Sequence, residues 1–147
     1  MGAGKSTVGR QVALMTERRF VDTDEEIERL HGPIPALFER SEAEFRQIEE
    51  AIVASALREP EPGVIALGGG AVLSETTRRF LRRRAFTVWL HVDPGTAWER
   101  VRGADRPLAQ EESAFHRLYE ERVPVYGDVA EARATSTRLA VSPAGTG

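Results

Sequence analysis

Hydrophobic residues in this chain form short helical and strand-like patterns that alternate along the sequence. The first helical pattern follows a small, polar start and is formed by Val8, Val12, Leu14 and Met15. Short apolar runs at 20–21 and 64–67 are followed by polar or glycine residues, as buried parallel strands often are. Helices are predicted over about 5–18, 25–32, 36–40, 42–57, 74–84, 96–102 and 113–130, and strands over 20–21, 64–67, 86–92 and 138–141.

The order of these elements predicts the fold. Strands that alternate with helices favour an α/β fold with a mostly parallel sheet. Because the chain has 147 residues, we expect one domain spanning residues 1–147. Asp24 and Ser74 are expected to cap the helices that follow them, and Pro124 to kink or interrupt the last helix.

Composition and charge narrow the range of partners. Twenty basic and 23 acidic residues give a net charge of -3, which leaves no positive excess to hold a nucleic acid. The absence of cysteine removes disulfides, thiolate metal sites and cysteine nucleophiles. No apolar stretch approaches the roughly 20 residues that span a bilayer, and no signal peptide is visible. We therefore expect a cytoplasmic chain that binds neither nucleic acid nor membrane. A monomer is a separate expectation, which composition does not decide.

The strongest motif is GAGKST at residues 2–7, which matches the second half of the phosphate-binding loop G-x-x-x-x-G-K-[ST]. In such a loop, backbone N–H groups and the following helix dipole hold the β-phosphate, the lysine reaches the β- and γ-phosphates, and the hydroxyl binds Mg²⁺. Lys5 is the only lysine among twenty basic residues, which suggests that this position needs a compact ammonium group. The alternative is a glycine turn that merely caps a helix.

The motif is incomplete at its start. Counted back from Gly4, its first glycine would lie two positions before Met1, and the strand that normally leads into the loop is also missing. That strand is the central one in a parallel sheet of this kind. We therefore expect the natural chain to begin at least about eight residues earlier, because a missing central strand would leave buried backbone groups unpaired.

Two further motifs directly follow predicted strands. Asp22 and Asp24 come after the first strand, and three consecutive glycines, 68–70, come after the second. Ligands of open α/β sheets bind beyond the carboxyl ends of the strands, so one carboxylate could face a metal and the other a substrate. The glycines would let backbone N–H groups approach a small ligand. The alternatives are that Asp24 only caps its helix, that Asp22 lies in a solvated turn, and that the glycines form only a tight connection.

Three arginines occur in suggestive contexts. Arg46 lies on a predicted helix with Glu49 three residues further on, Arg106 precedes a proline in a polar loop, and Arg122 comes two residues before Pro124. Each could also be an ordinary surface cation.

In this order, the motifs GAGKST, VDTD (21–24), FRxxE (45–49), LGGG (67–70), RP (106–107) and RxPxY (122–126) resemble those of the shikimate kinases. These are small P-loop kinases of the nucleoside monophosphate kinase type, and the resemblance extends from residue 1 to about 130. It implies a three-layer P-loop kinase fold, ATP and Mg²⁺ as cofactors, and transfer of the γ-phosphoryl group to the 3-hydroxyl of shikimate. It also implies a role in the biosynthesis of aromatic amino acids.

The resemblance assigns a role to each matching residue. The residues implied to hold ATP are Gly2, Ala3, Gly4, Lys5, Ser6, Thr7, Arg100 and Arg106. Those implied to bind shikimate are Asp24, Arg46, Gly69 and Arg122, and those implied to bind Mg²⁺ are Ser6 and Asp22. Lys5, Asp24 and Arg106 are the implied catalytic residues, with Arg106 in a lid over about 103–112. The final helix of the family has no counterpart after residue 142, so C-terminal contacts with adenine are not assigned.

Two rival functions are considered beside this one. A related kinase of the gluconate type would also bind a carboxylate, but FRxxE, LGGG and RxPxY are not expected together there. The other rival is a truncated nucleotide-binding chain without activity.

Overall fold

The computed structural model describes residues 4–91, 112–135 and 138–143, and the chain divides into two compact units. The first, Lys5–Ala85, is called the Lys5–Ala85 unit. The second consists of Phe86–Gly147 together with Met1–Gly4 and is called the Phe86–Gly147 unit. The expectation of one domain over 1–147 stays a prediction.

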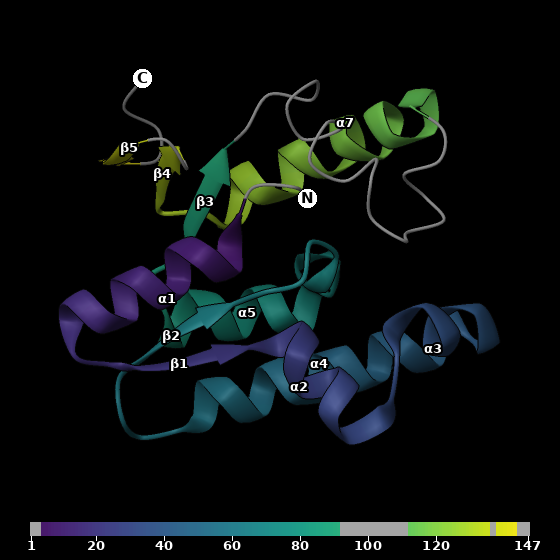
Figure 1. The fold of residues 1–147 in the computed structure, drawn as a ribbon. Helices are drawn as coiled ribbons and strands as arrows, with labels where there is room; N and C mark the ends of the chain where they lie inside the picture. The colour runs from purple at the N-terminus through teal and green to yellow at the C-terminus, as the bar shows by residue number, and fades with distance from the viewer. Residues whose placement is uncertain (1–3, 92–111, 136–137, 144–147) are drawn as a thin grey trace. The chain divides into compact units, whose positions relative to one another are not determined.

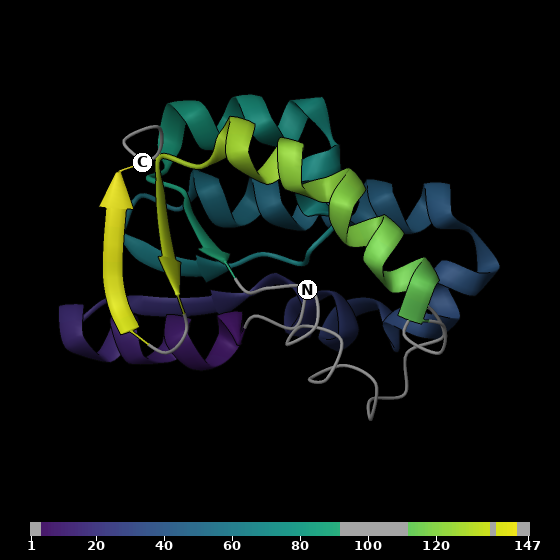
Figure 2. The same cartoon turned by 90° about the horizontal axis from the view of Figure 1, so that it is seen from above.

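The Lys5–Ala85 unit holds a parallel pair of strands between helices (Figure 1). Its elements are α1 (Lys5–Thr16), β1 (Arg19–Asp22), α2 (Thr23–His31), α3 (Ile34–Arg40), α4 (Glu42–Arg58), β2 (Gly63–Ala66), the 3₁₀ helix η1 (Ala71–Leu73) and α5 (Glu75–Arg84). Asp22 lies opposite Ala66 where β1 and β2 end. Helix α1 covers one face of the pair, and α4 and α5 lie on the other (Figures 1 and 2). Both strands therefore end at the same edge, the one that α2 adjoins.

A cluster of large apolar side chains holds α2, α3 and α4 together. Ile27, Leu37 and Phe45 are its buried members, one from each helix. The cluster is completed by the partly buried residues Ile34, Phe38, Ile48 and Ile52. Burying such side chains contributes roughly 1.5–3 kcal/mol each, so this cluster anchors the helices that follow β1.

Capping residues set several helix boundaries, and the sequence predicts those at Ser74 and Gly32. Ser74 caps α5 by accepting a hydrogen bond from the Thr77 N–H at 3.1 Å. Ser41 caps α4 in the same way through the Glu44 N–H. Helix α2 ends at Gly32, whose φ of 94° lies in the left-handed region that glycine adopts without steric cost. The predicted ends of these helices are thus confirmed to within a few residues.

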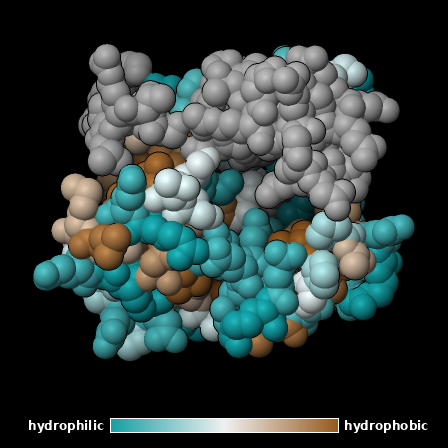
Figure 3. Space-filling model, viewed as in Figure 1, coloured by the Kyte–Doolittle hydropathy of each residue, from teal (hydrophilic) through white to brown (hydrophobic). Residues whose placement is uncertain are grey.

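Helix α1 buries only part of the face that its hydrophobic pattern predicts, because Val8 and Val12 are half-buried but Leu14 and Met15 are not. Its buried residues are Gly9 and Ala13, whereas Leu14 and Met15 are 80% and 73% exposed. A Cβ atom at Gly9 would lie 2.7 Å from Cε2 of Phe20, so the close approach of α1 to β1 requires a glycine. Small residues therefore form the closest contact with β1, and Leu14 and Met15 point outward. Apolar surface accordingly lies among hydrophilic side chains on the face shown in Figure 3.

The Phe86–Gly147 unit combines one long helix with a small sheet. Its described elements are β3 (Val88–His91), α7 (Glu112–Val129), β4 (Ala132–Thr135) and β5 (Arg138–Pro143). Strand β4 lies between the other two, parallel to β3 and antiparallel to β5. Helix α7 runs through Pro124 without interruption. Both units thus combine helices with parallel strands, which confirms the α/β class.

The pattern-based prediction missed two elements and placed others outside the described residues. Strand β4 was not predicted because its short sequence, ARAT, carries two alanines instead of large apolar residues. The short helix η1 was also missed. The predicted helix over 96–102 lies outside the described residues, as do residues 103–111 of the predicted lid. Among the described helices, none combines the length and the apolar character that crossing a membrane requires.

Candidate functional site

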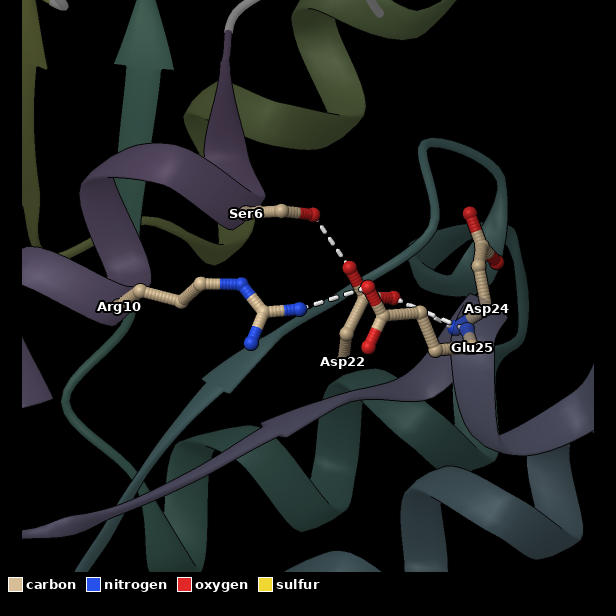
Figure 4. Close-up of polar contacts among 5 residues, drawn as sticks. All are labelled: Ser6, Arg10, Asp22, Asp24 and Glu25. Carbon is tan, nitrogen blue, oxygen red and sulfur yellow. Dashed lines mark hydrogen bonds and ion pairs between the residues drawn. The ribbon is translucent and has the colours of Figure 1, made fainter. Parts of the chain in front are cut away.

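Asp22 joins α1 to the start of α2 through its two carboxylate oxygens. Oδ1 accepts hydrogen bonds from the backbone N–H groups of Asp24 at 2.9 Å and Glu25 at 3.2 Å, which makes Asp22 the N-cap of α2. Oδ2 accepts a hydrogen bond from the hydroxyl of Ser6 in the first turn of α1 (Figure 4). The prediction that Asp24 caps this helix is therefore wrong, because the helix begins one residue after Asp22 and Asp24 lies inside its first turn.

The Ser6 and Asp22 side chains form a pair of oxygen donors next to the start of α1. Hydroxyl and carboxylate oxygens are ligands that Mg²⁺ prefers, and this ion commonly keeps several waters beside one or two protein carboxylates. The described residues contain no group of three or more histidine, cysteine or acidic side chains suited to a metal. The pair therefore fits Mg²⁺ held jointly with phosphate oxygens, and does not resemble a metal site enclosed by protein ligands.

Gly4 is the described residue that directly precedes α1, at the place where a phosphate-binding loop would end. Gly4 has a φ of 77°, a left-handed conformation that places it in a turn, and Lys5 is the first residue of α1. Thr7 lies exposed in the first turn of the helix. Gly2 and Ala3 lie outside the described residues, so the structure describes residues 4–7 of the GAGKST motif.

The carboxylate of Asp24 lies against the glycine segment, residues 68–70, which follows β2. A Cβ atom at Gly68 would lie 2.5 Å from Oδ1 of Asp24 and 3.2 Å from Oε2 of Glu49. Gly68 itself is buried. A side chain at this position would therefore have to displace the carboxylate of Asp24 from the backbone after β2.

The guanidinium group of Arg46 lies against the other end of the glycine segment. A Cβ atom at Gly70 would lie only 2.8 Å from Cζ of Arg46. Arg46 Nη1 also forms a 2.8 Å ion pair with Oε1 of Glu49, whose side chain is 5% exposed. Cζ of Arg46 lies 5.2 Å from the ring centroid of Phe45, where a cation–π attraction adds to the ion pair. These contacts hold Arg46 in one orientation while leaving about a quarter of its side chain exposed.

Two buried polar residues of this site were not assigned a role from the sequence. Thr23 is fully buried, and its hydroxyl connects the start of α2 to the backbone after β2. Glu49 carries the charge that pairs with Arg46. The i,i+3 spacing of arginine and glutamate in FRxxE was a signal for this ion pair, since such residues are neighbours on a helix surface. The Thr23 hydrogen bonds join segments distant in the sequence, so no local spacing indicates them.

Two ion pairs formed by acidic residues of α2 lie on the exposed surface. Arg10 on α1 forms a 2.7 Å ion pair with Glu25, and both side chains are more than half exposed (Figure 4). Hydrogen bonds from Arg29 hold the pKa of Glu26 below its ordinary value, and the same contact raises the pKa of Arg29. Exposed pairs of this kind contribute little to stability.

The remaining predicted site residues are not part of the described Lys5–Ala85 unit. Arg122 belongs to α7 in the Phe86–Gly147 unit, where its side chain is buried. Among the described residues, its Nε has no hydrogen-bond partner. Arg100 and Arg106 lie outside the described residues.

The Lys5–Ala85 unit thus places a carboxylate and a guanidinium group at opposite ends of the glycine segment, with Gly69 between them. The carboxylate of Asp24 can accept a hydrogen bond from a hydroxyl group, and the guanidinium of Arg46 can bind a carboxylate or phosphate group. The Ser6 and Asp22 oxygens lie beyond β1 at the same edge of the strand pair. This arrangement suits a small acidic molecule that carries hydroxyl groups.

Comparisons with known proteins show which family the chain resembles. The family model described as shikimate kinase matches residues 1–142. The shikimate kinase of Nitrobacter winogradskyi is 48% identical over 132 residues, which are 86% of this chain and 61% of that protein. The shikimate kinase of Ruegeria pomeroyi is 43% identical over 134 residues, which are 87% of this chain and 68% of that protein. This chain thus spans about three-fifths to two-thirds of the length of these two relatives.

Solved structures show the same likeness. A shikimate kinase from Acinetobacter baumannii in complex with shikimate has a TM-score of 0.86 and 36% identity, covering 94% of this chain and 80% of that one. A shikimate kinase from Bacteroides thetaiotaomicron has a TM-score of 0.82 and 33% identity, covering 95% of this chain and 83% of that one. The P-loop kinase fold expected from the sequence is therefore confirmed. With a family model that matches nearly the whole sequence and relatives above 40% identity, this chain belongs to the shikimate kinase family.

Proposed function

We propose that this chain transfers the γ-phosphoryl group of ATP to the 3-hydroxyl of shikimate. The observation that carries the proposal is the pair of opposite charges, Asp24 and Arg46, packed against the two ends of the glycine segment. Shikimate is a carboxylate with three ring hydroxyls, so it presents the groups that these two side chains recognise. Membership of the shikimate kinase family supports the same reaction.

Arg46 binds the carboxylate of the substrate in this proposal, and Asp24 orients the reacting hydroxyl and accepts its proton. A guanidinium group gives planar, two-point contact with a carboxylate, and its ion pair with Glu49 fixes that plane before substrate arrives. The backbone of Gly69 completes the contacts between the two side chains. Arg122 is proposed as a second cation for the carboxylate, in keeping with the RxPxY motif at 122–126 that resembles the family's.

The residues at the start of α1 hold the cofactors in this proposal. Lys5 and the backbone of residues 2–7 would bind the phosphates of ATP, and Ser6 and Asp22 would hold Mg²⁺. The bound Mg²⁺ would neutralise charge that develops on the phosphoryl oxygens. Arg106 is proposed to stabilise the same charge, and Arg100 to lie beside adenine. A cytoplasmic monomer is the proposed working form, in keeping with ATP as the phosphoryl donor.

The decisive test compares Arg46→Ala with Arg40→Ala in an assay that couples ADP release to a spectroscopic signal. Loss of a charge-assisted hydrogen bond costs about 1.5–3 kcal/mol, so Arg46→Ala should lower kcat/KM for shikimate roughly tenfold or more. The dissociation constant for ATP should stay unchanged.

Arg40 is the matched control, since it forms an exposed 2.8 Å ion pair with Glu44 away from the glycine segment. Arg40→Ala should leave both kinetic constants near those of the unmodified chain. An unchanged kcat/KM for shikimate in Arg46→Ala, or faster turnover of gluconate than of shikimate by the unmodified chain, would refute the proposal.

A further inference from the structure

The hydroxyl of Thr23 connects the two segments that carry the proposed substrate-binding groups. Thr23 is fully buried and lies between Asp22 and Asp24 at the start of α2. Its Oγ1 donates a hydrogen bond to the carbonyl oxygen of Ala66 at 3.2 Å and accepts one from the N–H of Gly68 at 3.3 Å. One hydroxyl thus satisfies two backbone groups at the point where β2 leads into the glycine segment.

The position of the glycine segment relative to α2 affects the Asp24 carboxylate, because Gly68 and this side chain are in close contact. The space that a Cβ atom of Gly68 would need is already taken by Oδ1 of Asp24, at 2.5 Å. A small shift of the Gly68 backbone therefore either presses on the carboxylate of Asp24 or moves away from it. Thr23 controls that shift, because it holds the N–H of Gly68 from the residue adjacent to Asp24.

We propose that Thr23 is a positioning residue that fixes Asp24 and the backbone of Gly69 relative to each other, so that the acceptor hydroxyl is held in line for phosphoryl transfer. This inference rests on the proposed function. It assigns Thr23 no contact with substrate, so loss of its hydroxyl should affect the chemical step more than the binding of ATP.

Thr23→Val tests the proposal because valine keeps the shape of the side chain and removes both hydrogen bonds. We expect kcat with shikimate to fall about tenfold or more, since a misplacement of about 1 Å can cost 100-fold in rate. The KM for ATP should stay within about twofold, as expected when uniform ATP binding is retained. Thr23→Ser, which restores the hydroxyl, should recover most of the lost kcat.

Thr77→Val is the matched control. Thr77 is also almost fully buried, but it lies on α5, where its backbone N–H is bonded to Ser74. This variant reports the general effect of losing a buried hydroxyl and should leave kcat unchanged. Equal kcat in Thr23→Val and the unmodified chain, or an equal loss in Thr77→Val, would overturn the proposal.

Hydrogen exchange measured without substrates tests the hydrogen bond of Thr23 independently of the proposed function. The amide of Gly68 should exchange faster in Thr23→Val than in Thr23→Ser, whatever substrate the enzyme uses. If exchange rises as expected but the unmodified chain does not phosphorylate shikimate, the proposed function fails and the hydrogen bond of Thr23 stands. Thr23→Ala is the second variant without a hydroxyl, and failure of both Thr23→Val and Thr23→Ala to fold would overturn the positioning role.

Discussion

The carboxylates at the end of β1 and the start of α2 have different environments although one residue separates them. Asp22 uses one oxygen to cap α2 and the other to bind Ser6. Asp24 lies inside the helix, and its side chain faces Gly68. The first residue is therefore suited to link the phosphate-binding end of α1 with α2, and the second to meet a substrate.

Substitutions of Asp22 should separate capping from metal binding. Asparagine retains an oxygen that can cap α2, so Asp22→Asn should change the unfolding free energy by less than about 0.5 kcal/mol, within the usual range of well-tolerated changes. Asp22→Ala should cost about 1 kcal/mol through loss of the cap. Both variants lack the carboxylate charge, so both should need more Mg²⁺ for half-maximal ATP turnover.

Chemical denaturation and Mg²⁺ titrations of activity measure the two effects independently. Equal stability of the two variants would contradict the capping role of Asp22. An unchanged Mg²⁺ requirement in both would contradict its role near the metal.

Among the elements, the glycine segment after β2 determines how closely the charged side chains of α2 and α4 can approach its backbone. Gly68 makes room for Asp24 from α2, and Gly70 makes room for Arg46 from α4. Neither glycine has a positive φ, so a larger residue at these positions is disfavoured by the space available and not by the backbone conformation. The atoms that a new methyl group would meet are ends of side chains, which can move while the backbone stays in place.

We therefore predict different kinetic defects for the two alanine variants. Gly68→Ala should displace Asp24 and lower kcat about tenfold or more with a smaller change in KM. Gly70→Ala should displace Arg46 and raise the KM for shikimate by a similar factor. Steady-state kinetics at varied shikimate concentration distinguish the two defects.

Gly127→Ala controls for adding a methyl group elsewhere. Gly127 lies in α7, and a Cβ atom there would meet nothing within 4 Å. This variant should keep its kinetic constants and gain about 0.5–1 kcal/mol of stability, because alanine favours a helix over glycine. Identical kinetic defects in Gly68→Ala and Gly70→Ala would show that the segment acts as a whole, contrary to the prediction.

At the scale of the whole molecule, substrate binding and stability are linked by mass action. A ligand that binds only the folded chain at about 100 times its Kd adds about 2.7 kcal/mol to the unfolding free energy. For 147 residues this corresponds to a rise in Tm of roughly 5–10 °C. Shikimate should produce such a shift, whereas gluconate at the same concentration should not.

Arg46→Ala provides the matched comparison for thermal unfolding. If the substitution weakens binding tenfold, the same shikimate concentration should add only about 1.4 kcal/mol, which is close to half of the original effect. Equal Tm shifts in both proteins would mean that Arg46 does not bind shikimate in the absence of ATP.

Much of the local structure was determined by the sequence itself, since short-range physics governs it. The helices from α1 to α5, strands β1 to β3, and the caps at Ser74 and Gly32 follow from side-chain spacing, hydrogen-bonding side chains and glycine. The motif order also identified the family and the residues Asp24, Arg46 and Gly69. The roles of these three residues in binding and catalysis stay predictions.

Only the tertiary structure decided which side chains face one another. Gly9 and Ala13 form the buried face of α1 because Phe20 fills the space beside Gly9, a contact that hydrophobic spacing cannot reveal. The cap of α2 is Asp22 and not Asp24, and β4 forms because two neighbouring strands supply hydrogen-bond partners for a sequence of weak strand preference. The bridge from Thr23 to Ala66 and Gly68 likewise joins residues more than forty positions apart. Such contacts depend on how close packed elements approach, which the packing of the folded chain decides and the local sequence pattern does not.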